Sequence, residues 1–159
     1  MPNPSTRLAD FLPYLLSVTS NAVSGRVADA YQARFGIRIS EWRVMAVLGD
    51  AGAMTQRRLV EATLMDKVAV NRACKLLEER GLIARSPNVH DGRSHHLELT
   101  TAGHAMHTEI MPMALAMEER IFAPLSEGER AIFKAMLAKV RAEVRAIDGN
   151  LAGVEDGIA

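Results

Sequence analysis

Residues 66–99 read DKVAVNRACKLLEERGLIARSPNVHDGRSHHLEL, and the spacing of their apolar residues changes part-way along. Asp66 has the residue type of a helix N-cap, because its carboxylate can accept from the free N–H groups of a first turn. The helix that it would open runs to Arg80 and is stopped by Gly81, a residue that tolerates the left-handed conformation found after helices. The first half of this stretch therefore predicts one short helix.

The second half of the stretch has the pattern of a β-hairpin. Residues 82–86 indicate a short strand, and residues 95–99 alternate with period two as a second strand. The residues between them, 87–93, are polar and hold Asp91-Gly92, so they predict a long turn at the tip.

Three further helices are expected before residue 66. Apolar residues recur at steps of three and four along the first of them, which has Pro13 near its start and Gly36 at its end. Ser40 is the expected N-cap of the second and Thr55 that of the third. The expected helices are 5–34, 41–49 and a short one from Thr55 to about Thr63.

Two long helices are expected after the hairpin. Thr100 would cap the first, and Pro112 inside it predicts a bend. Residues 126–129, Ser-Glu-Gly-Glu, form a capping box that opens the last helix. Residues 148–159 are rich in glycine and acids and are expected to be a loose tail.

This order predicts a mainly α fold with a small β-hairpin wing: a winged helix-turn-helix flanked by N- and C-terminal dimerisation helices. The flanking helices carry more apolar surface than so small a unit can cover, so a two-fold homodimer joined through both chain ends is expected. The alternative is a monomeric helical domain that closes on itself. The expected divisions are 1–36 (N-terminal dimerisation helix), 37–100 (winged helix-turn-helix), 101–147 (C-terminal dimerisation helices) and 148–159 (flexible tail).

The overall charge of the 159-residue chain does not indicate what kind of partner it binds, because 19 basic side chains balance 19 acidic ones. Residues 55–96, however, hold eight Lys and Arg against five Asp and Glu, a local charge of +3. Within the helix after Asp66 the basic residues lie in the first turns, which suits a helix that enters a DNA groove by its N-terminus. A solvated helix face with ion pairs is the alternative explanation.

The wing matches a pattern that is specific to one family, D-x-R followed by L-T-x-x-G. The matching residues here are Asp91, Arg93, Leu99, Thr100 and Gly103. With residues 39–44 and 70–83, this segment resembles the MarR family of bacterial transcriptional regulators, and the resemblance covers roughly residues 8–147. It implies a dimeric winged-helix protein that binds double-stranded DNA at a pseudo-palindromic operator. It also implies a repressor, often released by a small aromatic or phenolic ligand.

The resemblance implies roles for individual residues of the DNA-binding surface. Arg93 would enter the minor groove, held in position by a charge-assisted hydrogen bond to Asp91. An Asp-Gly turn with an incidental exposed Arg is the alternative. Val68 and Ala69 stand where relatives often have hydroxyls, and they would contact thymine methyl groups or merely pack. The remaining candidates are Asn71, Arg72 and Lys75 for bases and phosphates, Lys67 for a phosphate, and Thr55, Gln56 and Arg57 for the DNA backbone.

A ligand site is expected where the first helix crosses the helix-turn-helix, in an apolar cleft with a few polar groups. The candidates by position are Tyr14, Ser17, Arg38, Trp42 and Arg43. The alternative is that Trp42 belongs to the core and that both arginines form surface or inter-subunit ion pairs.

Other function classes have less support in the sequence. Histidines gather near the wing, but their spacing is no recognised zinc signature, so no metal is expected; metal response stays an alternative. Cys74 is expected to be a buried small hydrophobe, with a redox-responsive role as the alternative. No phosphate loop or nucleophile elbow is present, so neither an enzyme nor a cofactor is expected. The apolar run 11–18 is too short to span a membrane, and a cytoplasmic location without a membrane partner is expected. A winged helix that binds another protein is the second hypothesis.

Overall fold

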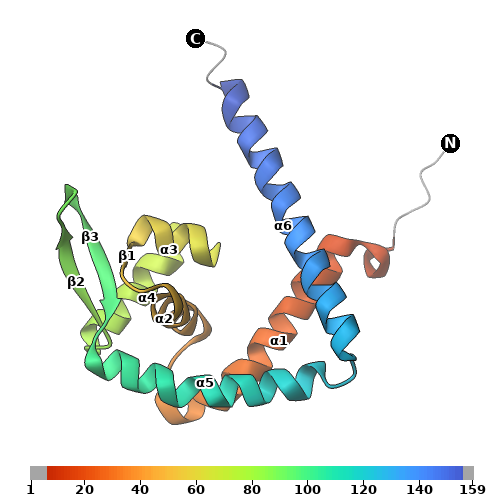
Figure 1. The fold of residues 1–159 in the computed structure, drawn as a ribbon, viewed down its shortest axis with the longest axis horizontal. Helices are drawn as coiled ribbons and strands as arrows, with labels where there is room; N and C mark the ends of the chain where they lie inside the picture. The colour runs from red at the N-terminus through yellow and green to blue at the C-terminus, as the bar shows by residue number, and fades with distance from the viewer. Residues whose placement is uncertain (1–6, 156–159) are drawn as a thin grey trace. The chain divides into compact units, whose positions relative to one another are not determined.

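The computed structural model describes residues 7–155 of the chain, with side chains to residue 149. Its helices and strands form a mainly α fold with one small sheet, which confirms the fold class (Figure 1). Their order is η1 (Leu8–Asp10), α1 (Leu12–Phe35), α2 (Ile39–Ala51), β1 (Met54–Thr55), α3 (Gln56–Thr63), α4 (Lys67–Glu79), β2 (Ile83–Asn88), β3 (Asp91–Leu99), α5 (Thr101–Phe122) and α6 (Glu127–Glu155). The chain divides into two compact units, Met1–Glu118 and Glu119–Ala159.

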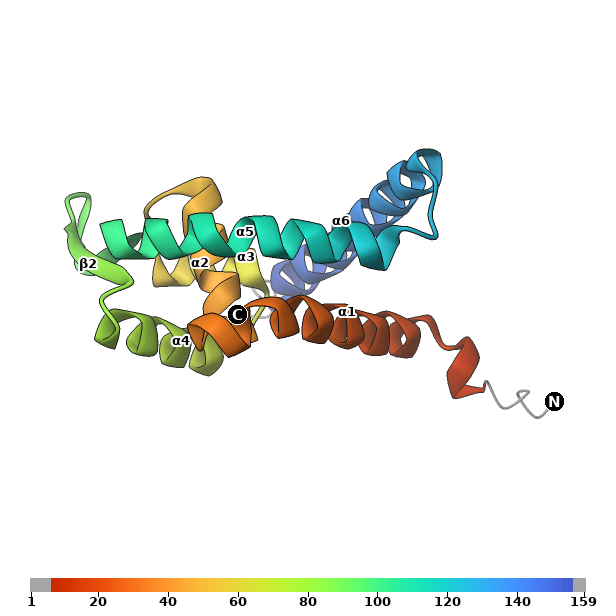
Figure 2. The same cartoon turned by 90° about the horizontal axis from the view of Figure 1, so that it is seen from below.

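The hydrophobic core of the first unit lies between α2, α4, α5 and the sheet. α4 buries the stripe Val70, Ala73, Cys74 and Leu77, whose spacing of three and four places them on one helical face. Burial of the two larger side chains, Val70 and Leu77, contributes roughly 1.5–3 kcal/mol each to folding. Figure 2 shows α5 passing across α2. The ring of His107 on α5 stacks on that of Trp42 on α2, with their centroids 5.5 Å apart. Burial of this stripe leaves the opposite face of α4 to solvent.

Local capping signals set several boundaries as predicted. The Asp66 side chain accepts from the Ala69 N–H at 2.8 Å, and the Thr55 hydroxyl accepts from the Arg58 N–H at 3.3 Å. Gly36 closes α1 with φ +63°, a conformation that favours glycine.

The starts of α1 and α2 differ from the prediction. α1 begins at Leu12 with Pro13 in its first turn, where its missing N–H is harmless, and residues 1–6 lie outside the described part of the chain. α2 begins at Ile39, so the assignment of Ser40 as N-cap is wrong. The Glu41 carboxylate instead accepts from the Arg38 main-chain N–H at 2.8 Å. A side chain in the first turn thus replaces the expected cap.

The predicted long turn of the wing is wrong, because β2 runs to Asn88 and β3 already begins at Asp91. Pro87 is tolerated inside β2 because this strand lies at the edge of the sheet, where a missing N–H costs no ladder bond. The sequence also missed β1, which pairs antiparallel with β3 and is only two residues long. The sheet order is β1-β3-β2.

The C-terminal helices follow the predicted caps. The Gly103 N–H donates to the Thr100 hydroxyl at 3.1 Å, and α5 continues through Pro112, where the bend stays a prediction. The Ser126 and Glu129 side chains each accept from the other's main-chain N–H, which confirms the capping box.

The loose tail expected from Asp148 is wrong as far as Glu155, because α6 continues to that residue. No proline interrupts this stretch, and extending an existing helix costs less than starting one. Residues 156–159 lie outside the described part. None of the helices among the described residues is long and apolar enough to cross a bilayer.

Candidate nucleic-acid interface

The solvent face of α4 carries most of the side chains expected to meet DNA. Lys67, Asn71, Arg72 and Lys75 are all exposed, because the alternate face of the helix is buried in the core. Val68 is 70% exposed, so it is not a packing residue, whereas Ala69 is half-buried. The arrangement presents amide, guanidinium, ammonium and methyl groups together, which are the groups that read base edges in a major groove.

The wing holds Arg93 through a hydrogen bond between its main chain and Asp91. The Asp91 carboxylate accepts from the Arg93 main-chain N–H at 3.0 Å, and no ion pair joins the two side chains among the described residues. The expected hydrogen bond between Asp91 and Arg93 is therefore present, and it uses the main-chain N–H of Arg93. Asp91 fixes the backbone turn and leaves the Arg93 side chain exposed and free to reach a partner.

Side chains also brace the tip of the wing. The Asn88 side chain donates to the Ser94 hydroxyl at 2.9 Å and accepts from the His90 N–H at 3.0 Å. These bonds compensate for the register shift between Pro87 and Asn88, where the ladder is irregular. The tip is therefore an ordered support for Arg93.

A hollow of about 400 Å³ lies between the wing and the start of α3, and we call it the wing hollow. Its lining is polar and basic, with three arginines and one aspartate. The lining residues are Thr55, Gln56, Arg57, Arg85, Asn88, Asp91, Arg93, Ser94 and His95. A concave surface with this charge suits a phosphate group.

Sequence reasoning missed four residues of the wing hollow: Arg85, Asn88, Ser94 and His95. The strand pairing brings them together, with Pro87 opposite His95 and Asn88 opposite Asp91. Arg85 was the one sequence signal for these residues, because it is a basic residue on a predicted strand that directly follows the helix now seen as α4.

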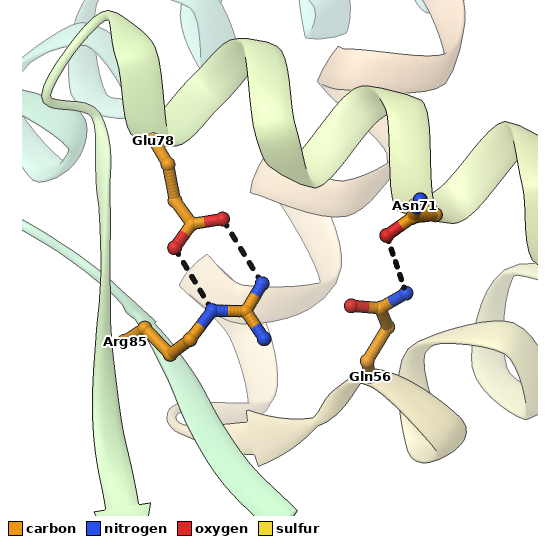
Figure 3. Close-up of polar contacts among 4 residues, drawn as sticks. All are labelled: Gln56, Asn71, Glu78 and Arg85. Carbon is orange, nitrogen blue, oxygen red and sulfur yellow. Dashed lines mark hydrogen bonds and ion pairs between the residues drawn. The ribbon is translucent and has the colours of Figure 1, made fainter.

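Two polar contacts link α4 to its neighbours (Figure 3). Arg85 on β2 donates to both carboxylate oxygens of Glu78, at 2.9 and 3.0 Å. This ion pair lowers the pKa of Glu78 and raises that of Arg85. In the N-terminal half of α4, the Gln56 side-chain N–H donates to the side-chain oxygen of Asn71, Oδ1, at 3.2 Å.

The five candidates for a ligand site are only partly brought together. Trp42 is buried against Tyr31, with ring centroids 5.6 Å apart, and burial raises the pKa of Tyr31 to about 12. Arg43 is half-buried and donates to the Ser24 hydroxyl at 3.2 Å, whereas Arg38 is exposed.

Tyr14 and Ser17 lie on the exposed N-terminal half of α1. Tyr14 precedes Tyr31 by 17 residues, which is about 25 Å along a helix axis. Because Trp42 packs against Tyr31, the fold of this unit keeps Tyr14 far from Trp42. A core position for Trp42 agrees with the structure.

The structure also describes the surroundings of the residues considered for redox and metal chemistry. Cys74 is buried, and its burial raises the pKa of the thiol to about 11, so it is protonated at neutral pH. Within residues 7–149, no group of three or more His, Cys, Asp or Glu side chains is placed to hold a metal ion.

Comparison with known proteins bears on the same elements. A family model described as "MarR family" matches residues 35–94. A solved MarR/EmrR family regulator from Acinetobacter sp. ADP1 is 25% identical, covers 88% of this chain and 99% of its own, and superposes with a TM-score of 0.81. The chain is therefore similar to MarR family regulators, both in the matched segment and in its fold.

Two curated relatives extend the match beyond the MarR segment. The repressor NicR of Pseudomonas putida is 30% identical over 96 residues, which are 60% of this chain and 61% of NicR. The regulator PecS of Dickeya dadantii is 26% identical over 137 residues, 82% of each chain. The MarR-matched segment spans α2, β1, α3, α4, β2 and the first residues of β3, and so includes most of the residues that line the wing hollow. The recognition made from the wing motif is confirmed.

Proposed function

We propose that this chain is a sequence-specific regulator of transcription that binds double-stranded DNA and represses the genes it controls. The observation that carries the proposal is the joint exposure of Lys67, Asn71, Arg72 and Lys75 on α4, beside the basic wing hollow. The similarity to the MarR family and to a repressor, NicR, supports it. Nothing in this arrangement calls for catalysis or a cofactor, and we assign the chain no enzymatic activity.

In this proposal each part of the interface contacts a different part of the duplex. α4 enters the major groove, where Asn71 and Arg72 read bases and Val68 contacts thymine methyl groups. Arg93 enters the adjacent minor groove, and the wing hollow lies against the backbone with Thr55 and Arg57. Lys67 and Lys75 add phosphate contacts, which strengthen binding without selecting sequence.

We further propose that two copies form a homodimer. Apolar side chains are exposed along η1 and the N-terminal half of α1 in the first unit, and along α6 in the second. They are Leu8, Phe11, Leu12, Leu15, Leu16 and Val18 in the former, and Ile132, Met136, Val140, Val144 and Ile147 in the latter. Burying such stripes against a second copy removes them from water. A two-fold pair would present two α4 helices to half-sites of a pseudo-palindromic operator, about 34–36 Å apart.

A small aromatic or phenolic ligand is the proposed effector. Arg38 and Arg43 would supply cations for a carboxylate, and Trp42 would support the wall from within the core. Tyr14 and Ser17 remain candidates on the exposed half of α1. Such a ligand releases DNA only if it prefers a geometry in which the two α4 helices are wrongly spaced. The proposed place of action is the cytoplasm, because the DNA lies there.

The test is fluorescence anisotropy with the DNA upstream of the chain's own gene. Arg72→Ala and Arg93→Ala should each weaken binding, whereas Arg26→Ala should not, because Arg26 lies on α1 and pairs with Asp29 at 3.2 Å. If the dimer neutralises about 6–10 phosphates, affinity should fall by roughly 10³–10⁵ between 50 and 200 mM salt. Failure to bind any duplex at low salt would overturn the proposal and favour a winged helix that binds another protein.

A further inference from the structure

The side chain expected to read a base, Asn71, is already engaged by a residue of another helix. Gln56, the first residue of α3, donates its side-chain N–H to the Asn71 carbonyl oxygen at 3.2 Å (Figure 3). We call Gln56 and Asn71 the amide pair. Because an amide has one hydrogen-bond-accepting end and one donating end, the direction of this bond decides which end of Asn71 is left for DNA.

A third residue, Arg85, lies on the side of Gln56 that faces away from Asn71. Figure 3 shows the carbonyl oxygen of Gln56 turned toward the Arg85 guanidinium, and its NH₂ group turned toward Asn71. A guanidinium has only donors and a full positive charge, so it attracts a carbonyl oxygen and repels an amide NH₂. The reverse orientation of Gln56 would point two donors at a cation.

Arg85 itself is held in place by Glu78. Two hydrogen bonds, at 2.9 and 3.0 Å, use the Nε and Nη2 atoms of Arg85 and leave Nη1 outside the ion pair. The side chains are only 35% and 29% exposed. Such a two-point contact fixes the plane of the guanidinium as well as its position. The charge that orients Gln56 is therefore fixed relative to α4.

The consequence for Asn71 is a preferred role as donor. Its carbonyl oxygen is turned toward α3, and its NH₂ group is the end that no bond of the described residues uses. In the major groove the adjacent N7 and O6 atoms of guanine are both acceptors, whereas adenine offers an N7 acceptor beside an N6 donor. The usual pairing of asparagine with adenine uses both ends of the amide.

We propose that Glu78, Arg85 and Gln56 act in series to fix Asn71 as a hydrogen-bond donor, so that α4 reads guanine through N7 and O6 at the Asn71 position. This inference rests on the proposed DNA-binding function and names its base preference. Gln56 and Arg85 are positioning residues in it, since they act on the base through Asn71.

The first test uses DNA selected from a random pool by the full-length protein. Asn71→Ala identifies the base pair concerned, because selectivity is lost there alone. At that position guanine should be preferred, and 7-deazaguanine should weaken binding by about five-fold or more. If adenine is preferred, and both 7-deazaadenine and loss of its N6 amino group weaken binding, the proposal is wrong.

The second test reverses the amide pair. Gln56→Glu puts an acceptor-only carboxylate beside Arg85, so Asn71 should turn its NH₂ to position 56 and present its oxygen to DNA. Pool selection should then change the preferred base from guanine to one with a donor in the major groove, adenine or cytosine. Arg85→Leu should relax the preference without reversing it.

The matched control is Gln32→Glu, which makes the same charge change on the exposed surface of α1. It should leave the selected sequence unchanged, and thermal melting should show that all variants fold. If Gln56→Glu binds DNA and selects the wild-type base at every position, the amide pair does not orient Asn71. If the wild-type protein selects no sequence, the proposed function fails instead.

Discussion

Adding a single methyl group at Gly103 should destabilise the junction between the wing and α5. A Cβ atom there would overlap the Leu82 carbonyl oxygen and lie 3.0 Å from the carbonyl carbon and 3.3 Å from Leu99 Cδ2. The same Leu82 oxygen accepts from the Thr100 N–H at 3.1 Å, and the Thr100 hydroxyl donates to the Gly81 carbonyl at 2.6 Å. Because the obstacle is backbone, it cannot rotate away, and the junction must open.

The expected loss for Gly103→Ala follows from three contributions. Overpacking costs about 1–3 kcal/mol, weakening the Thr100–Leu82 bond about 0.5–1.5 kcal/mol, and the gain in helix propensity returns up to about 1 kcal/mol. The net loss of about 0.5–4.5 kcal/mol should lower Tm by roughly 1–18 °C in a chain of this size.

Gly25→Ala is the matched control, because it makes the same change in α1 where no atom lies within 4 Å. It should leave Tm unchanged or raise it by a few degrees. Thermal unfolding followed by circular dichroism measures both variants. A Gly103→Ala protein that melts at or above the wild-type temperature would refute the steric argument.

Three further outcomes are expected. Burial lowers the pKa of His107 below its usual 6.5, so the unfolded chain binds the proton more tightly than the folded one. Stability should therefore fall as pH drops below about 6.5. His107→Phe keeps a ring on Trp42 and should flatten the dependence of Tm on pH between 7 and about 5. Cys74, with a pKa near 11, should react with a thiol reagent at pH 8 only at the rate of unfolding, and rapid labelling of the native protein would contradict its burial. Arg80 donates to two main-chain carbonyls at the end of α1, at 3.1 and 2.8 Å. Arg80→Ala should therefore lower the free energy of unfolding in urea by about 1–2 kcal/mol, and Arg80→Lys by less. Equal losses would show that the two-nitrogen geometry of the guanidinium is unimportant.

The features that the sequence predicted well are those that depend on a few neighbouring residues. An N-cap such as Asp66 needs only an acceptor and the next turn of chain, and a capping box such as Ser126 to Glu129 is complete within four residues. The change from helical to alternating spacing after Gly81 is likewise local, which is why the wing was found.

The features that it missed depend on strand pairing or on packing. β1 is too short to show any period and exists because β3 provides a partner. The turn of the wing is shorter than predicted because Asn88 pairs opposite Asp91, and no local pattern predicts that pairing. The amide pair joins residues 15 positions apart in the chain, and no periodicity predicts which end of Asn71 faces outward.

In addition to its buried face, α4 is held by polar contacts with three other elements. Arg80 ties the end of α4 to the end of α1, Glu78 ties it to Arg85 on β2, and Asn71 is bonded to Gln56 on α3. The base preference should therefore be a property of this set, because α4 supplies the reading groups while its neighbours set their orientation. Transplanting residues 67–79 alone into another winged helix should transfer less of the preference than a transplant that also carries Gln56 and Arg85. Equal transfer in a pool selection would place the specificity in α4 alone.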